Sequence, residues 1–382
     1  MKTQIVWLNV IRFAAFFMLI CCHAADPFYA TATYATAEGM APVDPDMIQW
    51  AERWMAFVRP CVPLFVMITG ALSFPVKMEM GAFYKRRILR VLWPFLIWSV
   101  LYYLFPWFSG LAGADKSIIY KCFIWSDTDS QSIVPCLINI ARIPFTFNYS
   151  ASHMWYIYML IGLYLYMPIF SAWIERATKR QKELVLGLWL ASTFLPYLEE
   201  FAGPYAFGTC SWNAFGLFYY FAGFNGFLLL GHYIRCHVSW NLRQTLPIAA
   251  VMLIVGFAIT YFGYGYIMSL PEKTPEQIEL FWTYNSINVA LMSAAWFLVL
   301  KHIPFPLESH TAQWLGNLAF CGFGIYMIHY YFVGLAHELI THLDLPVPLQ
   351  IPAAAVLIFT LSWGIVAIVK KYLGKAAIYI MG

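Results

Sequence analysis

Charged side chains are scarce in this chain. They make up 11% of its 382 residues, whereas soluble proteins carry about 25%. Hydrophobic residues make up 62% of the chain and aromatic residues 19%, and Trp and Tyr are typically enriched where a membrane meets water. This composition excludes an ordinary soluble domain and predicts an all-α polytopic membrane protein.

Several features of other protein classes are missing. We find no soluble domain beside the membrane domain, no low-complexity tract and no inverted internal repeat of the kind that marks many transporters. The first apolar segment carries Arg12 and lacks a small-residue cleavage site, so we expect a retained helix rather than a signal peptide. The net charge of +4 says little about nucleic acid, because the location of the charges matters more than their sum, and we expect no nucleic-acid partner. We predict one integral membrane domain over residues 1–382.

The eight cysteines do not have the spacing of metal ligands, and we predict no metal site. Three of them, Cys122, Cys136 and Cys210, fall in predicted outer loops, where an oxidising compartment permits a disulfide. The sequence does not decide which two would pair.

Ten apolar stretches of about 20 residues, the length that spans a bilayer, follow one another along the chain. They lie near residues 5–25, 54–74, 88–108, 153–174, 184–200, 214–232, 246–268, 281–300, 314–340 and 349–369. With a cytoplasmic N-terminus, sixteen Lys and Arg residues fall in inner segments and five in outer segments, which agrees with the positive-inside rule. We therefore predict about ten transmembrane helices and two cytoplasmic termini. The longer outer connections are predicted at 26–53 and at 109–152, between helices 3 and 4.

One arginine and one histidine, Arg12 and His23, lie inside the first apolar segment, eleven positions apart. At roughly 100° per residue this is about three helical turns, which returns both side chains to one face about 16 Å apart. A guanidinium in a bilayer costs roughly 2.5–3.5 kcal/mol on insertion scales, so it usually faces a protein interior or a watery cavity. We interpret this face as one wall of an active site. Asp26, three residues after His23, is a candidate to orient the imidazole or to stabilise its cationic form.

A second arginine, Arg59, stands at the start of an apolar segment that also holds Pro60, Pro63 and Gly70. The prolines and the glycine predict a helix that bends around a cavity. Two interpretations of Arg59 stay open: a functional cation, or a structural bridge to a helix carbonyl.

A basic cluster of Arg86, Arg87 and Arg90 lies at the start of the third stretch, on its predicted cytoplasmic side. Such a cluster is suited to binding phosphate groups. It is equally well explained as a plain topology signal, because every predicted inner loop is basic.

Two further histidines lie in apolar segments. His153 opens the fourth stretch beside Trp155 and Tyr156, and His329 lies midway along the ninth. We expect these residues to contact the acceptor or line the site. The alternatives are an interfacial aromatic belt for the first group and a satisfied bundle histidine for His329.

These landmarks, taken in order, resemble the acyltransferase 3 family of bacterial membrane O-acyltransferases, and the resemblance spans essentially the whole chain. The matching pieces are the Arg12–ten residues–His23 motif, Arg59 with Pro63-Leu-Phe-Val-Met-Ile-Thr-Gly70, the basic segment Arg86-Arg87…Arg90, and His153-Met-Trp-Tyr156. The chain departs from the family pattern at Thr69, where Ser is usual, and at Met154, where Leu is commoner.

The resemblance implies a reaction in which an acetyl or similar acyl group moves from acyl-CoA to a hydroxyl of a surface polysaccharide or lipid-linked glycan. Such a transfer needs a base to deprotonate the hydroxyl, and histidine is the usual residue, so we expect His23 to be the base. The basic cluster and Arg59 would bind the donor. Arg12 would also bind the donor, or it would stabilise the oxyanion that develops during the transfer. No bound cofactor is expected, because acyl-CoA is the donor substrate.

Two other classes of protein stay open. A transporter or flippase for a polysaccharide or lipid-linked sugar would share the helices and buried cations, but it would need no catalytic base. A sensor or scaffold would tolerate the loss of Arg12 and His23 without chemical consequence. The bacterial inner membrane as location depends on the family resemblance.

Overall fold

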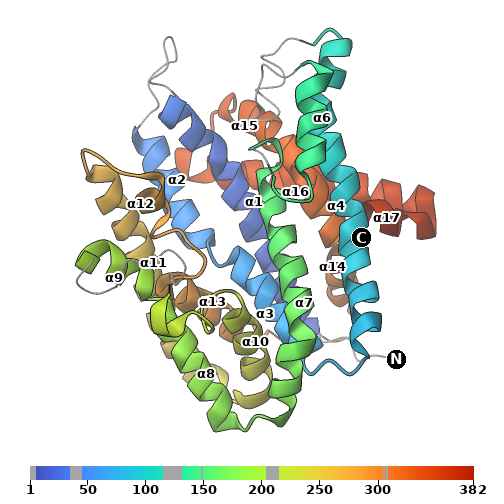
Figure 1. The fold of residues 1–382 in the computed structure, drawn as a ribbon. Coiled ribbons are helices and arrows are strands. Elements are labelled where there is room, and N and C mark those ends of the chain that lie inside the picture. The colour runs from blue at the N-terminus through green and yellow to red at the C-terminus, as the bar shows by residue number, and fades with distance from the viewer. Residues whose placement is uncertain are drawn as a thin grey trace. The chain divides into compact units, whose positions relative to one another are not determined.

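The computed structural model describes residues 6–34, 45–114, 131–147, 149–203, 215–303, 306 and 309–382. Within these residues all regular structure is helical, with no strand, which confirms the all-α prediction (Figure 1). The longer helices, in chain order, are α1 (Val6–Tyr34), α2 (Pro45–Val58), α3 (Cys61–Ser73), α4 (Met80–Leu111), α6 (Ile133–Arg142), α7 (Trp155–Arg176), α8 (Lys179–Ser192), α9 (Leu195–Ala202), α10 (Asn225–His237), α11 (Leu242–Ser269), α13 (Ile287–Leu300), α14 (His310–Ile328), α15 (Val333–Thr341) and α16 (Val347–Leu373). Shorter elements are η1 (Tyr149–Met154), η4 (Gly216–Phe218), α12 (Pro275–Glu279), η5 (His329–Phe332), η6 (Gly374–Ala377) and α17 (Ile378–Met381).

In the described part of the chain, eight helical segments are long and apolar enough to cross a membrane. They are Val6–Phe28, Pro45–Ser73, Met80–Leu111, Ala151–Arg176, Lys179–Ala202, Leu242–Ser269, His310–Thr341 and Val347–Met381. The chain is therefore a multi-pass membrane protein. The predicted stretches at 214–232 and 281–300 correspond to α10 and α13, which have 13 and 14 residues. The count of ten and the sidedness of the ends stay predictions.

The two predicted outer connections contain more helix than expected. Helix α1 continues to Tyr34 and α2 begins at Pro45, so helix extends into both ends of the connection predicted at 26–53. The Ala-rich sequence after Pro27 favours helix, since Ala has the highest helix propensity. The segment 109–152 contains α6, whereas residues 115–130, which include Cys122, lie outside the described residues, as does Cys210.

The chain divides into two compact units, described here one at a time. Unit 1 consists of Met1–Met18, Ala56–Lys77 and Met167–Gly316. Unit 2 consists of Leu19–Met55, Met78–Tyr166 and Asn317–Gly382. A single domain over 1–382 stays a prediction.

In unit 1, α3 and α10 lie side by side (Figure 1), and glycines set how closely they approach. A Cβ added at Gly70 would lie 2.0 Å from the backbone oxygen of Leu228, and one at Gly231 would lie 2.0 Å from that of Met67. Backbone thus meets backbone at both positions, as in other membrane helix pairs joined through small residues. Gly70, which belongs to the motif named above, therefore has a packing role.

The second helix pair of unit 1, α11 with α13, is joined by a buried polar network. The side-chain amide of Asn288 donates to Thr260 Oγ1 at 2.7 Å and to the carbonyl of Phe281 at 3.0 Å. The hydroxyl of Tyr197 donates to Asn288 Oδ1 at 2.6 Å. Because both ends of the amide are paired, this buried polar group is satisfied.

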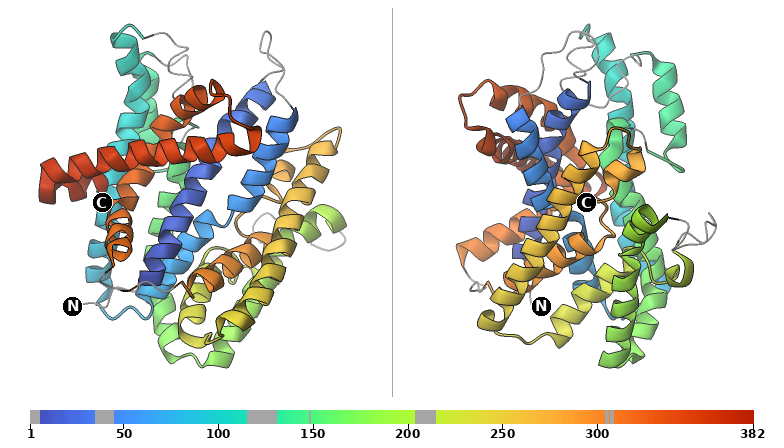
Figure 2. Two further views of the ribbon diagram at one scale, coloured as in Figure 1. Left: turned by 180° about the vertical axis from the view of Figure 1, so that it is seen from behind. Right: turned by 90° about the vertical axis from the view of Figure 1, so that its left-hand side faces the viewer.

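In unit 2, α4 packs against α6 and α17. The C-terminal helices α16 and α17 are drawn in red in Figure 2. The indole nitrogen of Trp98 on α4 donates to the carbonyl of Ile380 at 2.8 Å, and the Tyr102 hydroxyl donates to that of Met327 at 2.8 Å. Met327 lies near the end of α14, so these bonds attach α4 to the C-terminal part of the chain.

Two membrane-length segments, each shared between the two units, contain a 3₁₀-helix in the part that belongs to unit 2. Helix α14 ends at Ile328 and is followed by η5 and then α15, and α7 is preceded by η1, in which Ala151 is non-helical. Short 3₁₀ turns within or beside α-helices often mark functional positions. His329 is the first residue of η5, and His153 lies in η1.

Candidate active site

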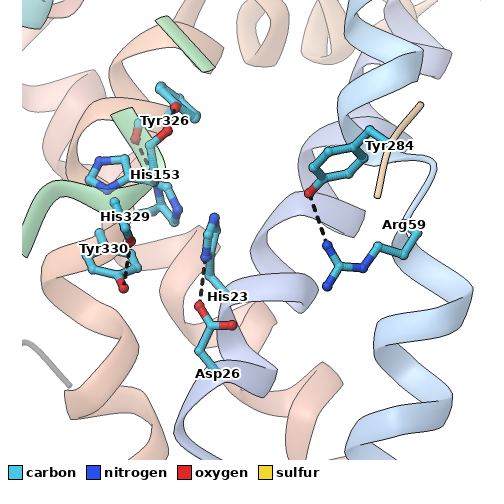
Figure 3. A network of polar contacts seen from close by, with 9 residues as sticks. His23, Asp26, Arg59, His153, Tyr284, Tyr326, His329 and Tyr330 are labelled. Atoms are coloured by element: carbon cyan, nitrogen blue, oxygen red, sulfur yellow. Dashed lines mark hydrogen bonds and ion pairs between the residues drawn. The ribbon is translucent and has the colours of Figure 1, made fainter. Parts of the chain in front are cut away.

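The site begins with a histidine–carboxylate pair on α1. His23 Nδ1 lies 2.9 Å from Asp26 Oδ2, and the two side chains are 17% and 19% exposed (Figure 3). A spacing of three residues places both side chains on one face of a helix. A carboxylate accepts hydrogen bonds when ionised, so the His23 ring donates through Nδ1 and its basic lone pair is on Nε2.

His329 lies beside this pair, at the position directly after the end of α14. Its ring bonds to the Tyr326 carbonyl through Nδ1 at 2.8 Å. A carbonyl only accepts hydrogen bonds, so Nδ1 carries the proton and Nε2 is an acceptor. The rings of His329 and His23 are 5.2 Å apart between centroids.

His153 completes a group of three histidines, all in unit 2 and drawn together in Figure 3. Its ring centroid lies 5.4 Å from that of His329 and 6.5 Å from that of His23. The segment that carries His153 is attached to α14 through its backbone, because the hydroxyl of Tyr326 donates to the carbonyl of His153.

Tyrosine rings surround the three histidines. Tyr330 stacks on His153 at 4.7 Å and meets His23 edge-on at 5.5 Å. Tyr102 contacts His153 at 5.0 Å from the α4 side. The hydroxyl of Ser152 donates to that of Tyr330 at 3.3 Å.

Several nitrogens of this group have no hydrogen-bond partner among the described residues. They are both ring nitrogens of His153 and Nε2 of His329, and the two side chains are 1% and 0% exposed. Buried polar atoms are nearly always paired with protein or with ordered water. The two imidazoles therefore have free capacity for a polar ligand or for water.

The described residues contain no group of three His, Cys, Asp or Glu side chains suited to hold a metal ion. The three histidines meet through ring faces and edges. Their geometry is that of a packed polar cluster.

The two predicted membrane arginines lie in unit 1, and each has a defined environment. Arg12 shares helix α1 with His23 and donates to Asn9 Oδ1 at 2.7 Å. Arg59 lies where the chain breaks between α2 and α3, before Pro60, and is 7% exposed. A break is expected there, because a proline disfavours helical geometry in the residue before it.

Aromatic residues hold the guanidinium of Arg59. It lies 4.6 Å from the ring centroid of Trp282 and 5.6 Å from that of Tyr284, and Nη1 donates to the Tyr284 hydroxyl at 3.4 Å (Figure 3). Such cation–π contacts stabilise a buried cation without neutralising it.

The basic cluster lies at the start of α4, where Arg86 and Arg90 are exposed and Arg87 lies 6.0 Å from the ring of Phe83. It does not touch the three histidines. Tyr102 lies twelve positions after Arg90 on α4, which is about 18 Å along a helix axis. Trp155 and Tyr156 begin α7, and Tyr156 contacts Tyr326 at 5.7 Å.

Some residues around the three histidines and around Arg59 could not be identified from their neighbours in the sequence. Tyr102 is 51 positions from His153, and Tyr284 is 225 positions from Arg59. Others stand close to a predicted residue in sequence, namely Tyr326 and Tyr330 beside His329, Ser152 beside His153, and Asn9 near Arg12. The aromatic run Phe281-Trp282-Thr283-Tyr284 was the one visible hint of a cation-holding surface.

The fold and the site together define a multi-pass helical membrane protein with a half-buried histidine–carboxylate pair, a set of groups suited to proton transfer. The family model of the acyltransferase domain matches residues 5–367. The chain therefore belongs to this family, as its landmarks predicted, and it is a membrane acyltransferase. The comparisons with curated proteins and with solved structures returned no significant match.

Proposed function

We propose that the protein transfers an acetyl or similar acyl group from cytoplasmic acyl-CoA to a hydroxyl of a cell-surface polysaccharide or lipid-linked glycan, in the bacterial inner membrane. The observation that carries the proposal is the His23–Asp26 pair beside two further buried imidazoles. The proline-rich segment at Pro60 and Pro63 resembles that of the enterobacterial common antigen O-acetyltransferase, which favours acetyl as the transferred group.

His23 is the proposed base. Its Nε2 takes the proton of the acceptor hydroxyl as the oxygen attacks the thioester carbonyl, and a tetrahedral oxyanion forms. Collapse of this intermediate breaks the carbon–sulfur bond, and the proton on His23 passes to the departing CoA thiolate. The products are the O-acyl ester and CoA, and the imidazole is neutral again.

Asp26 is proposed as a positioning residue. Its carboxylate holds the His23 ring through Nδ1 and stabilises the positive charge that the ring gains with the proton. His153, His329, Trp155 and Tyr156 are proposed to line the site of the acceptor, and the unpartnered nitrogens of the two histidines would receive its hydroxyl groups.

The arginines are proposed to serve the donor. The exposed cluster of Arg86, Arg87 and Arg90 suits its phosphate groups. Arg90 and Tyr102 lie about 18 Å apart along α4, a distance that the pantetheine arm would span to reach the histidines. Arg59 would bind the donor within the membrane, and Arg12 would do the same or stabilise the oxyanion.

The function is tested on the glycans themselves. A deletion strain should lose alkali-labile acyl esters from its purified surface glycans, and the wild-type gene should restore them, as mass spectrometry measures. The mass difference identifies the acyl group. Unchanged esters in the deletion strain, with glycan retained inside the cell, would refute the proposal and favour transport.

Asp26→Asn should lower kcat by on the order of 10²-fold, with KM changed by less than about threefold, because the substitution removes the charge while keeping the shape. Initial rates of CoA release by the purified protein measure both constants, once the glycan test has identified donor and acceptor. Asp26→Glu, which restores the carboxylate, should recover part of kcat. Equal losses in both variants would show that Asp26 is needed only for packing.

A further inference from the structure

His153 is a deeply buried histidine whose two ring nitrogens both lack a polar partner. The residue is 1% exposed, and neither Nδ1 nor Nε2 has a hydrogen-bond partner among the described residues. The neighbouring His329 differs, because its Nδ1 bonds to the Tyr326 carbonyl at 2.8 Å. Buried polar atoms are nearly always paired, so two unpaired nitrogens on one ring call for a partner that binds there.

The position of the His153 ring is set by its neighbours in unit 2. Tyr330 stacks on it, with ring centroids 4.7 Å apart, and Tyr102 lies roughly perpendicular to it at 5.0 Å. The hydroxyl of Tyr326 donates to the backbone carbonyl of His153. These contacts hold the ring through its aromatic face and its backbone, and they leave its nitrogens unbonded. A polar group held in this way is preorganised for a ligand.

The surroundings of His153 favour its neutral form. Burying a charge without a partner is costly, and two more imidazoles lie nearby, with centroids at 5.4 Å for His329 and 6.5 Å for His23. In the proposed mechanism His23 gains a positive charge, which a second positive ring would oppose. A neutral imidazole carries one N–H donor and one accepting nitrogen.

The N–H of His153 is therefore a donor without an acceptor among the described residues. Nε2 of His329 does not accept it, because that nitrogen is itself unpartnered. The accepting nitrogen of His153 suits a hydroxyl of the acceptor, as proposed above. The donating nitrogen suits an oxygen that becomes negatively charged, since hydrogen bonds to charged acceptors are the stronger ones.

We propose that His153 donates its N–H to the oxyanion that forms on the acyl carbonyl during transfer. As the acceptor oxygen attacks, a carbon–oxygen bond forms and the carbonyl electron pair moves onto the carbonyl oxygen, which accepts the hydrogen bond. On collapse this pair re-forms the carbonyl, the carbon–sulfur bond breaks, and the thiolate takes the proton from His23. His153 keeps its own hydrogen throughout. The role rests on the proposed function, which supplies the base and the thioester donor.

The distance between His153 and His23 fits this division of roles (Figure 3). Each ring reaches about 3 Å beyond its nitrogen through a hydrogen bond. The attacking oxygen and the oxyanion are bonded to the same tetrahedral carbon. Two hydrogen bonds that meet these oxygens at an angle bridge rings whose centroids are 6.5 Å apart.

The test is the rate of CoA release from acyl-CoA by the purified full-length protein, measured with the glycan acceptor and, separately, with water as acceptor. His153→Phe keeps an aromatic ring against Tyr330 and removes both nitrogens. It should lower both rates by on the order of 10²- to 10³-fold, the usual effect of losing one oxyanion donor. KM for either substrate should change by less than about threefold, because the bond forms only in the transition state.

Two amide variants restore a donor at this position. His153→Asn and His153→Gln place an N–H near the positions of Nδ1 and Nε2, and at least one of them should recover to within about tenfold of the wild type. Both should keep the pH dependence of the wild type, because a donor that stays neutral does not titrate during the reaction.

The matched control is His337→Phe. Nδ1 of His337, on α15, is also buried without a hydrogen-bond partner among the described residues. This variant should change both rates by less than about twofold, because it removes no group from the proposed site. Melting temperatures in detergent verify that each variant is folded.

Three results would overturn the role of His153. If His153→Phe raises only the KM for the glycan and leaves release to water unchanged, the ring binds the acceptor alone. Equal losses in all three His153 variants would show that the ring is needed for packing. Wild-type rates with His153→Phe would exclude an oxyanion donor. Glycan that stays unesterified while His153-dependent release to water persists would refute the glycan acceptor alone.

Discussion

His23→Ala should lower acyl transfer by about 10²- to 10⁴-fold, the usual contribution of a positioned general base. The imidazole has its Nδ1 bonded to Asp26 at 2.9 Å, which leaves Nε2 as the basic atom for the acceptor hydroxyl. Alanine removes that atom while the helix keeps its backbone. Surface glycans from the deletion strain carrying the His23→Ala gene should therefore lack acyl esters that the wild-type gene restores.

The matched control is His342→Ala. His342 is exposed and bonds to the carbonyl of Glu338, at 2.6 Å, so this variant should acylate like the wild type. Equal membrane content of all three proteins, shown by immunoblot and by gel filtration in detergent, removes folding as an explanation. Normal ester levels with His23→Ala would exclude this residue as the base.

Gly231→Ala should destabilise the protein by about 3 kcal/mol or more, the upper part of the range for overpacking. The new Cβ would meet the backbone oxygen of Met67 at 2.0 Å, and a backbone atom of a packed helix has little room to move away. Against a total stability of about 5–15 kcal/mol, this is a large fraction. Thermal unfolding in detergent, followed by circular dichroism, measures the change.

Gly187→Ala is the matched control, because Gly187 also lies in a helix, α8, and an added Cβ meets no atom within 4 Å. Alanine should stabilise this position by roughly 0.5–1 kcal/mol through helix propensity. If both variants unfold at the same temperature, the close approach of α3 and α10 does not limit stability.

The histidine–carboxylate pair was predictable because it is local. His23 and Asp26 are three residues apart on one helix, and helical geometry alone brings them together. The neighbours His153 and His329 were singled out one at a time, as polar groups in apolar segments. Their approach to His23 was not predictable, since it depends on how α14 and the segment before α7 deviate from regular helix.

The contacts of Arg59 were likewise only partly predictable from the sequence. The helix break at Arg59 follows from Pro60. Trp282 and Tyr284, which hold the guanidinium, come from a distant part of the chain. Likewise, hydropathy located helices in all ten stretches. It did not foresee that α10 and α13 have only 13 and 14 residues, because apolar composition does not fix where a helix begins and ends.

The bond from His329 Nδ1 to the Tyr326 carbonyl gives the proposed site a preference among acceptor molecules. With its proton held on Nδ1, the ring offers only a lone pair at Nε2, so it binds groups that have a hydrogen to donate. A sugar hydroxyl meets that requirement, whereas an ester or ether oxygen does not. Because the reacting hydroxyl gives its proton to His23 Nε2 in the proposed mechanism, the hydroxyl held at His329 would be a second one that stays unacylated, and the site would favour acceptors that carry two neighbouring hydroxyls.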